Sequence, residues 1–210
     1  MTNLDTIFLK AIKNAQQRGN VFVISGPSGV GKGTLISMLI KKHPEIVLSV
    51  SATTRKPRAG EVNGINYLFT PKERFEEMIE TDEFLEWANF AGNYYGTCRS
   101  IVEQTLFEGR DIALEIDVKG ALQVKEKLPG AILIFILPPS IKELESRLFK
   151  RKTDSEEEIK RRLSIVESEI NKKGSFNYEI VNDNLEKALQ SLEGIILAER
   201  CKVTNVKPER

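Results

Sequence analysis

A glycine-rich turn between an apolar run and a helical pattern is the feature that most constrains this chain. Residues 21–25 (VFVIS) are apolar and β-branched, which predicts a buried strand. The segment GPSGVGK follows at 26–32, and residues 34–42 carry apolar side chains at helical spacing. A strand, a glycine-rich loop ending in lysine and a helix form a phosphate cradle, because inward-pointing N–H groups and a helix N-terminus both attract anions. The alternative is a plain turn with a surface lysine, and the register of all the parts favours the phosphate loop.

The residue after this lysine departs from the usual phosphate-loop motif. The motif has Ser or Thr there to hold Mg²⁺, whereas this chain has Gly33 and carries Thr34 one residue later. A shift of one residue turns a helical side chain by about 100°, so direct contact of Thr34 with Mg²⁺ is left open. Gly-Lys-Gly-Thr resembles the loop of nucleoside monophosphate kinases, in which phosphates and water hold most of the Mg²⁺. That resemblance implies an ATP site made of Gly26, Pro27, Ser28, Gly29, Val30, Gly31, Lys32, Gly33 and Thr34.

Strand and helix patterns alternate through most of the chain. Further apolar runs predict strands at 47–50, 111–116, 131–137 and 178–181. Helical patterns follow at 118–127, 140–150 and about 184–200. Continuous apolar strands separated by helices indicate a parallel sheet that is covered on both faces. We therefore predict an α/β fold, a three-layer phosphate-loop sandwich around a parallel core sheet.

Two segments interrupt this alternation. Residues 52–96 contain short runs of mixed polarity with many turn residues, which predicts a small mixed α/β subdomain inserted into the core. Within it, Thr70-Pro71-Lys72-Glu73 predicts a helix start with a capping box and proline in the first helical position. Residues 147–162 are rich in charge and suit either a solvated surface or a mobile helical lid.

These patterns predict one main domain at 20–205 behind an N-terminal extension at 1–19. The expected divisions of the main domain are a core at 20–51, 97–146 and 163–205, the inserted subdomain at 52–96 and the lid at 147–162. Apolar residues at helical spacing predict a short amphipathic helix at 4–17. Packing against the body of the protein is preferred for it over a membrane-surface or transit-peptide role.

Composition excludes several classes of protein. The chain has 31 basic and 30 acidic residues, so we expect no nucleic-acid partner, and any anion must be held by local charge. Two cysteines, Cys98 and Cys201, are too few for a disulfide framework and indicate a reduced, cytoplasmic chain. No apolar run reaches the ~20 residues of a membrane span, so no membrane partner is expected. The only histidine, His43, and the only tryptophan, Trp87, are expected to have structural roles.

A second group of anion-binding side chains follows the predicted strand at 47–50. Arg55 and Arg58 are three residues apart, separated by the rigid Pro57, next to hydroxyl groups at 51, 53 and 54. An arginine fork binds two phosphate oxygens at once, so this pair suits a phosphate dianion. An exposed basic loop is the alternative.

Several motifs in order give the chain a close resemblance to the guanylate kinase family over about residues 20–200. They are the phosphate loop, SATTRKPRAGE at 51–61, Glu86-Trp87, GNYYGT at 92–97, Glu115-Ile116-Asp117 and Val181-Asn182-Asp183. The resemblance implies reversible, Mg²⁺-dependent transfer of the γ-phosphoryl group of ATP to GMP or dGMP, giving ADP and GDP, in purine nucleotide metabolism. It makes the inserted subdomain the GMP-binding part and implies no certain protein ligand for Mg²⁺.

The same resemblance implies an acceptor site for GMP. Its expected residues are Ser51, Arg55, Arg58, Tyr67, Glu86, Tyr95, Thr97 and Asp117. Glu86 can accept from N1–H and the amino group of guanine, while the Thr97 hydroxyl donates to O6. Adenine offers the opposite pattern and would face Glu86 unfavourably.

On the catalytic side, the resemblance implies roles for residues from the loop, the strand ends and the lid. They are Lys32, Arg55, Asp117, Arg147, Arg151 and Arg162, which neutralise phosphate charge or, for Asp117, orient Arg55 and Mg²⁺-bound water. Glu115 is expected to assist, and Lys152 stands where related lids often have glycine. Asn182 either contacts the adenine of ATP or belongs to the start of the last helix.

Two other functions are alternatives to the enzyme. A scaffold of the same family that binds proteins would have a degraded phosphate loop and acceptor site, whereas Lys32, Arg55 and Arg58 are all present. A kinase for another monophosphate would not need the guanine-specific pair Glu86 and Thr97. The sequence leaves open the oligomeric state and the preference between GMP and dGMP.

Overall fold

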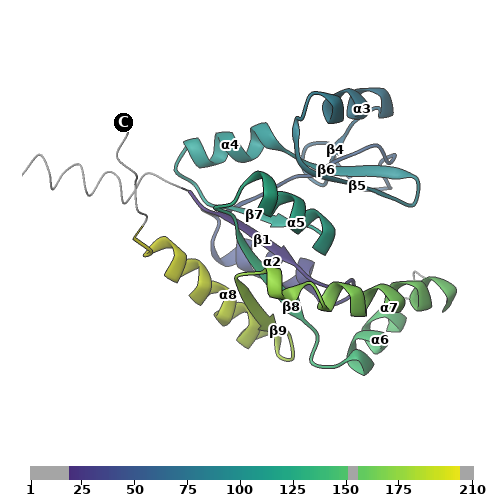
Figure 1. Ribbon diagram of the computed structural model, residues 1–210, viewed down its shortest axis with the longest axis vertical. Helices are drawn as coiled ribbons and strands as arrows, with labels where there is room; N and C mark the ends of the chain where they lie inside the picture. The colour runs from purple at the N-terminus through teal and green to yellow at the C-terminus, as the bar shows by residue number, and fades with distance from the viewer. Residues whose placement is uncertain (1–18, 151–155, 204–210) are drawn as a thin grey trace, which may run out of the picture.

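The computed structural model describes residues 19–150 and 156–203, with side chains described outside 150–162, and it confirms the α/β prediction (Figure 1). Five parallel strands form the core sheet in the order β2–β7–β1–β8–β9. Their bounds are β1 Val21–Ser25, β2 Val47–Leu48, β7 Ile112–Glu115, β8 Ile132–Leu137 and β9 Tyr178–Val181. The helix predicted at 4–17 lies outside the described residues.

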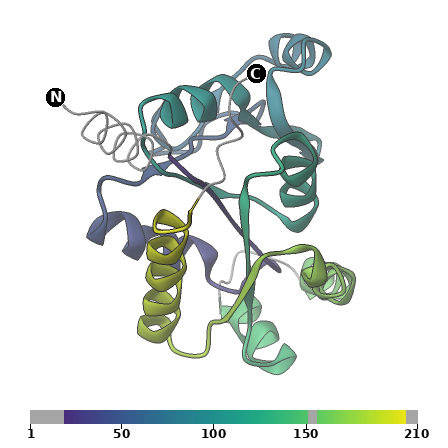
Figure 2. The ribbon, with the colours of Figure 1, turned by 60° about the vertical axis from the view of Figure 1, so that its left-hand side comes forward.

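Alternation along β1 divides the core into two apolar layers. Phe22 and Ile24 face the cluster that includes α2 (Lys32–Lys42) and α8 (Leu185–Arg200). Val21 and Val23 face the cluster that includes α4 (Arg99–Phe107) and α5 (Val118–Lys127). Because successive strand side chains point to opposite faces, an apolar strand is covered by helices on both sides. This is the predicted three-layer sandwich, and Figure 2 shows α8 beside α2 in one outer layer.

A second, mixed sheet lies beside the core sheet in the order β4–β3–β6–β5. Its strands are β3 Ala52–Thr53, β4 Leu68–Phe69, β5 Phe84–Phe90 and β6 Asn93–Cys98. The helix α3 Lys72–Glu80 lies between β4 and β5 in the sequence. The small core of this sheet contains Phe75 stacked on Phe84, with ring centroids 4.3 Å apart. Trp87 packs against the same cluster, as expected. Figure 1 shows α3 and this sheet at one end of the molecule and α6 (Ile141–Lys150) with α7 (Glu156–Ile170) at the other.

The start of α3 corrects one prediction. The helix begins at Lys72, so Pro71 precedes the first helical residue, and no side chain caps the helix. The Thr70 hydroxyl instead donates to the Leu68 carbonyl at 3.1 Å. The predicted capping box is therefore wrong, since the threonine hydroxyl bonds back to β4 instead of capping the helix. The structure also starts α2 at Lys32, two residues before the predicted position.

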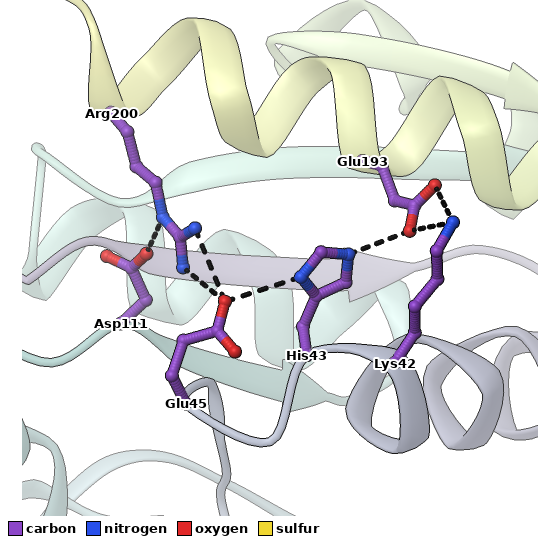
Figure 3. Close-up of polar contacts among 6 residues, drawn as sticks. All are labelled: Lys42, His43, Glu45, Asp111, Glu193 and Arg200. Carbon is purple, nitrogen blue, oxygen red and sulfur yellow. Dashed lines mark hydrogen bonds and ion pairs between the residues drawn. The ribbon is translucent and has the colours of Figure 1, made fainter.

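An ion-pair network fastens the end of α2 to α8 and to the start of β7 (Figure 3). His43 Nε2 lies 2.7 Å from Glu193 and its Nδ1 lies 3.3 Å from Glu45. Arg200 donates to the buried Asp111 at 2.6 Å and also reaches Glu45 at 3.5 Å. The structural role expected of His43 is confirmed. Within the described ranges, no helix combines the length and apolarity that a membrane crossing requires.

Candidate active site

The candidate site lies along the carboxyl edge of the core sheet, where ligands bind in open parallel α/β sheets. β1 leads into the phosphate loop, β7 leads to Asp117, and β9 leads to Asn182. Ser51 follows β2 and is half-buried just before β3. Four strand ends therefore bring predicted site residues from distant parts of the sequence to one edge.

The phosphate loop spans residues 26–31 between the central strand and α2. Gly31 has a φ of 94°, in the left-handed region that favours glycine, immediately before the helix. The first N–H groups of any helix have no acceptor within it, and the helix dipole adds partial positive charge there. Together these features suit a phosphate group.

Lys32 folds back over this loop. Its Nζ donates to the carbonyls of Gly26 at 2.6 Å and Pro27 at 3.1 Å, so the ammonium group lies beside the loop backbone. Glu169 of α7 is close enough for Lys32 to lower its pKa, although burial outweighs this and raises the pKa overall. The cation is thus held at the loop and lies within electrostatic reach of α7.

Asn182 and Arg147 brace the loop from outside. The buried Asn182 side chain donates to the Val30 carbonyl at 2.8 Å. Arg147 donates to the Asn182 carbonyl at 3.1 Å and, through Nε, to Glu143 at 2.9 Å. The alternative role for Asn182, capping the start of α8, belongs to Asn184, whose side chain accepts from the Lys187 N–H. The contact of Asn182 with adenine stays a prediction.

The other lid residues are only partly described. Arg151 lies outside the described residues, as does the Arg162 side chain, although α7 itself includes position 162. Of the three predicted lid arginines, Arg147 alone is described in full, and it contacts the phosphate loop directly through Val30 at 3.4 Å.

Arg55 lies at the centre of the acceptor cluster. Its guanidinium is 5.3 Å from the centre of the Tyr67 ring, and Tyr67 meets Tyr95 edge to face with ring centroids 6.0 Å apart. A hydrogen bond with Glu61, 2.8 Å long, raises the pKa of Arg55, and Tyr95 adds to this. The structure brings these predicted residues together, whereas the Arg58 side chain is exposed on the loop.

Glu61 is a residue whose role the sequence analysis missed. One of its oxygens accepts from Arg55, and the other accepts from the Arg58 backbone N–H at 2.7 Å. Arg55 and Arg58 together lower the pKa of the Glu61 carboxyl. The only sequence signal was its place in the quoted motif, three residues after Arg58, and that spacing indicates no particular contact.

Glu86 and Thr97 form a buried polar pair across β5 and β6. The Thr97 hydroxyl donates to Glu86 Oε1 at 2.7 Å. Thr97 is 1% exposed and Glu86 is 5% exposed. Burial raises the pKa of the Glu86 carboxyl from 4.5 to about 7, and the charge of Asp117 contributes. A carboxylate that is expensive to bury, and whose hydrogen-bond donors from Thr97 are neutral, is suited to a ligand with further donors.

Asp117 and Glu115 lie between the two clusters. Asp117 is exposed and caps α5 by accepting from Gly120 N at 2.7 Å. Glu115 lies beside the start of α2, since a Cβ on Gly33 would be 3.3 Å from its Oε1. Asp117 acts electrostatically on both Glu86 and Glu169, and Glu115 acts on Tyr67. The donor loop and the acceptor cluster are therefore within electrostatic reach of the same two carboxylates.

Comparisons with known proteins show which family this chain resembles. The chain matches a family model described as guanylate kinase over residues 18–199. It is 50% identical over 192 residues to a guanylate kinase of Caldanaerobacter subterraneus, covering 91% of this chain and 93% of that protein. It is 55% identical over 179 residues to a guanylate kinase of Synechococcus sp., covering 85% and 82%. A crystal structure of guanylate kinase from Anaplasma phagocytophilum matches with a TM-score of 0.72 and 33% identity, covering 90% and 89%.

Proposed function

The chain belongs to the guanylate kinase family, and we propose that it transfers the γ-phosphoryl group of ATP to GMP or dGMP, giving ADP and GDP or dGDP. One observation carries the proposal: Glu115 lies beside the phosphate loop at Gly33 and within electrostatic reach of Tyr67 in the arginine–tyrosine cluster, and Asp117 acts in the same way on the buried Glu86. Phosphoryl transfer needs mainly positioning and neutralised charge, which two facing anion sites supply. The free cysteines suit a reduced, cytoplasmic setting.

On the donor side, the loop amides and Lys32 hold the phosphates of ATP. Lys32 leaves its two carbonyl partners and donates to phosphate oxygens, an exchange of neutral acceptors for charged ones. The segment at 147–162 acts as the lid, in which Arg147, Arg151 and Arg162 neutralise the transferred group and exclude water. Asn182 contacts the adenine from the base of the loop.

On the acceptor side, the inserted subdomain at 52–96 holds the phosphate of GMP. Arg55 and Arg58 bind its oxygens as forks. Hydroxyl groups donate further hydrogen bonds to the phosphate from Ser51, Tyr67 and Tyr95. Glu61 accepts from Nη2, on one side of the Arg55 fork, at 2.8 Å. The phosphate therefore meets an arginine that is already oriented.

Glu86 and Thr97 select guanine. Ionised Glu86 accepts from N1–H and the amino group, and the Thr97 hydroxyl turns from Glu86 to donate to O6. The exchange replaces the hydrogen bond from the Thr97 hydroxyl to Glu86 by three hydrogen bonds to the base, two accepted by Glu86 and one donated by Thr97. A buried polar site of this kind rejects bases that cannot complete the pairing.

Mg²⁺ is the metal that this chemistry requires, and it neutralises charge on the phosphates when bound. The exposed carboxylates Asp117 and Glu115 supply the hard oxygen groups that Mg²⁺ prefers, through its water shell. Asp117 would also orient Arg55 when that arginine binds the phosphate and Glu61 at the same time.

A coupled ADP-release assay tests the function. The protein with ATP and Mg²⁺ is given GMP, dGMP, AMP, CMP or UMP in turn, and turnover with the two guanine nucleotides alone is the expected result. Lys32→Ala, as a control, should remove turnover from a folded protein. Absence of turnover in the wild type with any acceptor would favour a binding scaffold of the same fold.

A further inference from the structure

A side chain from a core helix forms hydrogen bonds with the free backbone edge of β5, the edge strand of the second sheet. β5 is paired with β6 on one side only, and its other side packs against α5. There the Gln123 amide donates to the Trp87 carbonyl at 3.1 Å and accepts from the Trp87 N–H at 3.2 Å. One side chain thus satisfies both backbone groups of the residue next to Glu86, as a neighbouring strand would.

A bulge in β5 turns Glu86 towards α5. Phe84 pairs with Cys98 and Glu86 pairs with Thr97, so one residue of β5 is extra at this point. In a regular strand, Glu86 would share a face with Phe84, which is buried in the subdomain core. Bulges redirect side chains in this way. Because of the bulge, Trp87 lies on the same face of the sheet as Phe84. Glu86 lies on the opposite face, with Thr97 and α5.

Gly120 leaves the space that the Glu86 carboxylate occupies. A Cβ at this position would lie 2.7 Å from Glu86 Oε2 and 3.2 Å from its Cδ. Gly120 is inside α5, where glycine is less favourable than alanine. The close approach of the carboxylate is the physical reason for glycine here. Gly120 and Gln123 are three residues apart, so they lie on the same face of the helix.

We propose that Gly120 and Gln123 are positioning residues that fix the Glu86 carboxylate for guanine recognition, an inference that rests on the proposed function. Gln123 holds the backbone beside the bulge, and Gly120 sets how closely the carboxylate approaches α5. Neither residue touches the base. Their effect should therefore appear in the use of GMP and in its discrimination from IMP, which lacks the amino group that Glu86 reads.

Gly120→Ala is the sharpest test, and Gly194→Ala is its matched control. Gly194 lies within α8, and a Cβ there would meet nothing within 4 Å. Gly120→Ala should raise the KM for GMP by about tenfold or more, reduce the preference for GMP over IMP and leave the KM for ATP unchanged. Gly194→Ala should leave all three unchanged. An unchanged KM for GMP in folded Gly120→Ala, or an equal rise for both substrates, would overturn the proposal.

Gln123→Leu provides a second test that does not depend on Gly120. It removes both hydrogen bonds to Trp87 and should also raise the KM for GMP selectively, by about fivefold or more. In a Glu86→Gln background, neither substitution should add to the loss, since both act through that carboxylate. Additive losses would overturn the positioning role while leaving the proposed function intact. Normal GMP use by Glu86→Gln itself would overturn both the positioning role and the assignment of guanine recognition to Glu86, while leaving the phosphoryl transfer intact.

Discussion

Glu86→Gln is expected to stabilise the ligand-free protein at high pH while it damages guanine binding. Glu86 is 5% exposed, and burial raises the pKa of its carboxyl from 4.5 to about 7. Unfolding returns the pKa to its ordinary value, so the folded state holds the proton more tightly. The contribution of this group to stability is therefore fully present below pH 4.5 and is lost as the pH rises through 7.

The size of the effect follows from the two pKa values. Between them, the folded protein binds one more proton than the unfolded chain, and each pH unit removes about 1.4 kcal/mol from the free energy of unfolding. From about pH 5.5 to about pH 8, the wild type should lose about 2 kcal/mol through Glu86. Glutamine has nearly the same shape and can accept from Thr97, but it does not titrate. The stability of the variant relative to the wild type should therefore grow by about 2 kcal/mol over this range.

Urea unfolding of both proteins at several pH values between about 5.5 and 8, at constant ionic strength, measures this difference. Titrations of all other groups cancel when the two curves are subtracted. Glu126→Gln, which changes an exposed carboxylate on α5, is the matched control and should give a difference that does not depend on pH. A Glu86→Gln difference that is equally flat would refute the argument that burial of this carboxyl costs stability.

Three further outcomes follow from the same contacts. The kcat/KM for GMP should rise with pH up to about 7 and then level off, because only ionised Glu86 accepts from both guanine donors; a flat profile from about pH 6 to 8 would contradict this. Lys32→Ala should lower kcat by about 100-fold or more with an unchanged circular dichroism spectrum, and near-normal turnover would exclude its role at the phosphates. Glu61→Gln should raise the KM for GMP several-fold without affecting ATP, since Glu61 orients both Arg55 and the Arg58 backbone; an unchanged KM would show that the pair is only structural.

Local patterns predicted the donor half of the site. The strand at 21–25, the glycine-rich loop and the following helix are adjacent in sequence, so their spacing alone indicates their arrangement. α4 was not predicted, because it is a short helix of 9 residues with no side-chain cap to mark its start. The capping box at α3 was predicted wrongly from a short motif, because the same threonine side chain bonds to the preceding strand. Short motifs are ambiguous when two elements meet within a few residues.

The acceptor half depends on contacts between distant residues, which no single-sequence pattern encodes. Gln123 and Trp87 are 36 residues apart, and Thr97 and Glu86 are 11 residues apart. The bulge that turns Glu86 is a property of the pairing between β5 and β6, so the alternation within β5 alone predicts the wrong face. The resemblance to a family supplied the residues here, and the structure supplies the way in which they are held.

The residues that we propose for guanine recognition join the inserted sheet to the core. Glu86 belongs to β5 of the inserted sheet, whereas the groups behind it, Gly120 and Gln123, belong to a core helix. Lys127 at the end of the same helix donates to the Phe84 carbonyl at 2.8 Å and to Asp82 at 2.6 Å. The strand that carries Glu86 is thus held to α5 on both sides of the bulge. Movement of the subdomain away from α5 would break the contacts of Gln123 and Lys127 with β5 and part Glu86 from Gly120, whereas the bond between Glu86 and Thr97 would move with the sheet.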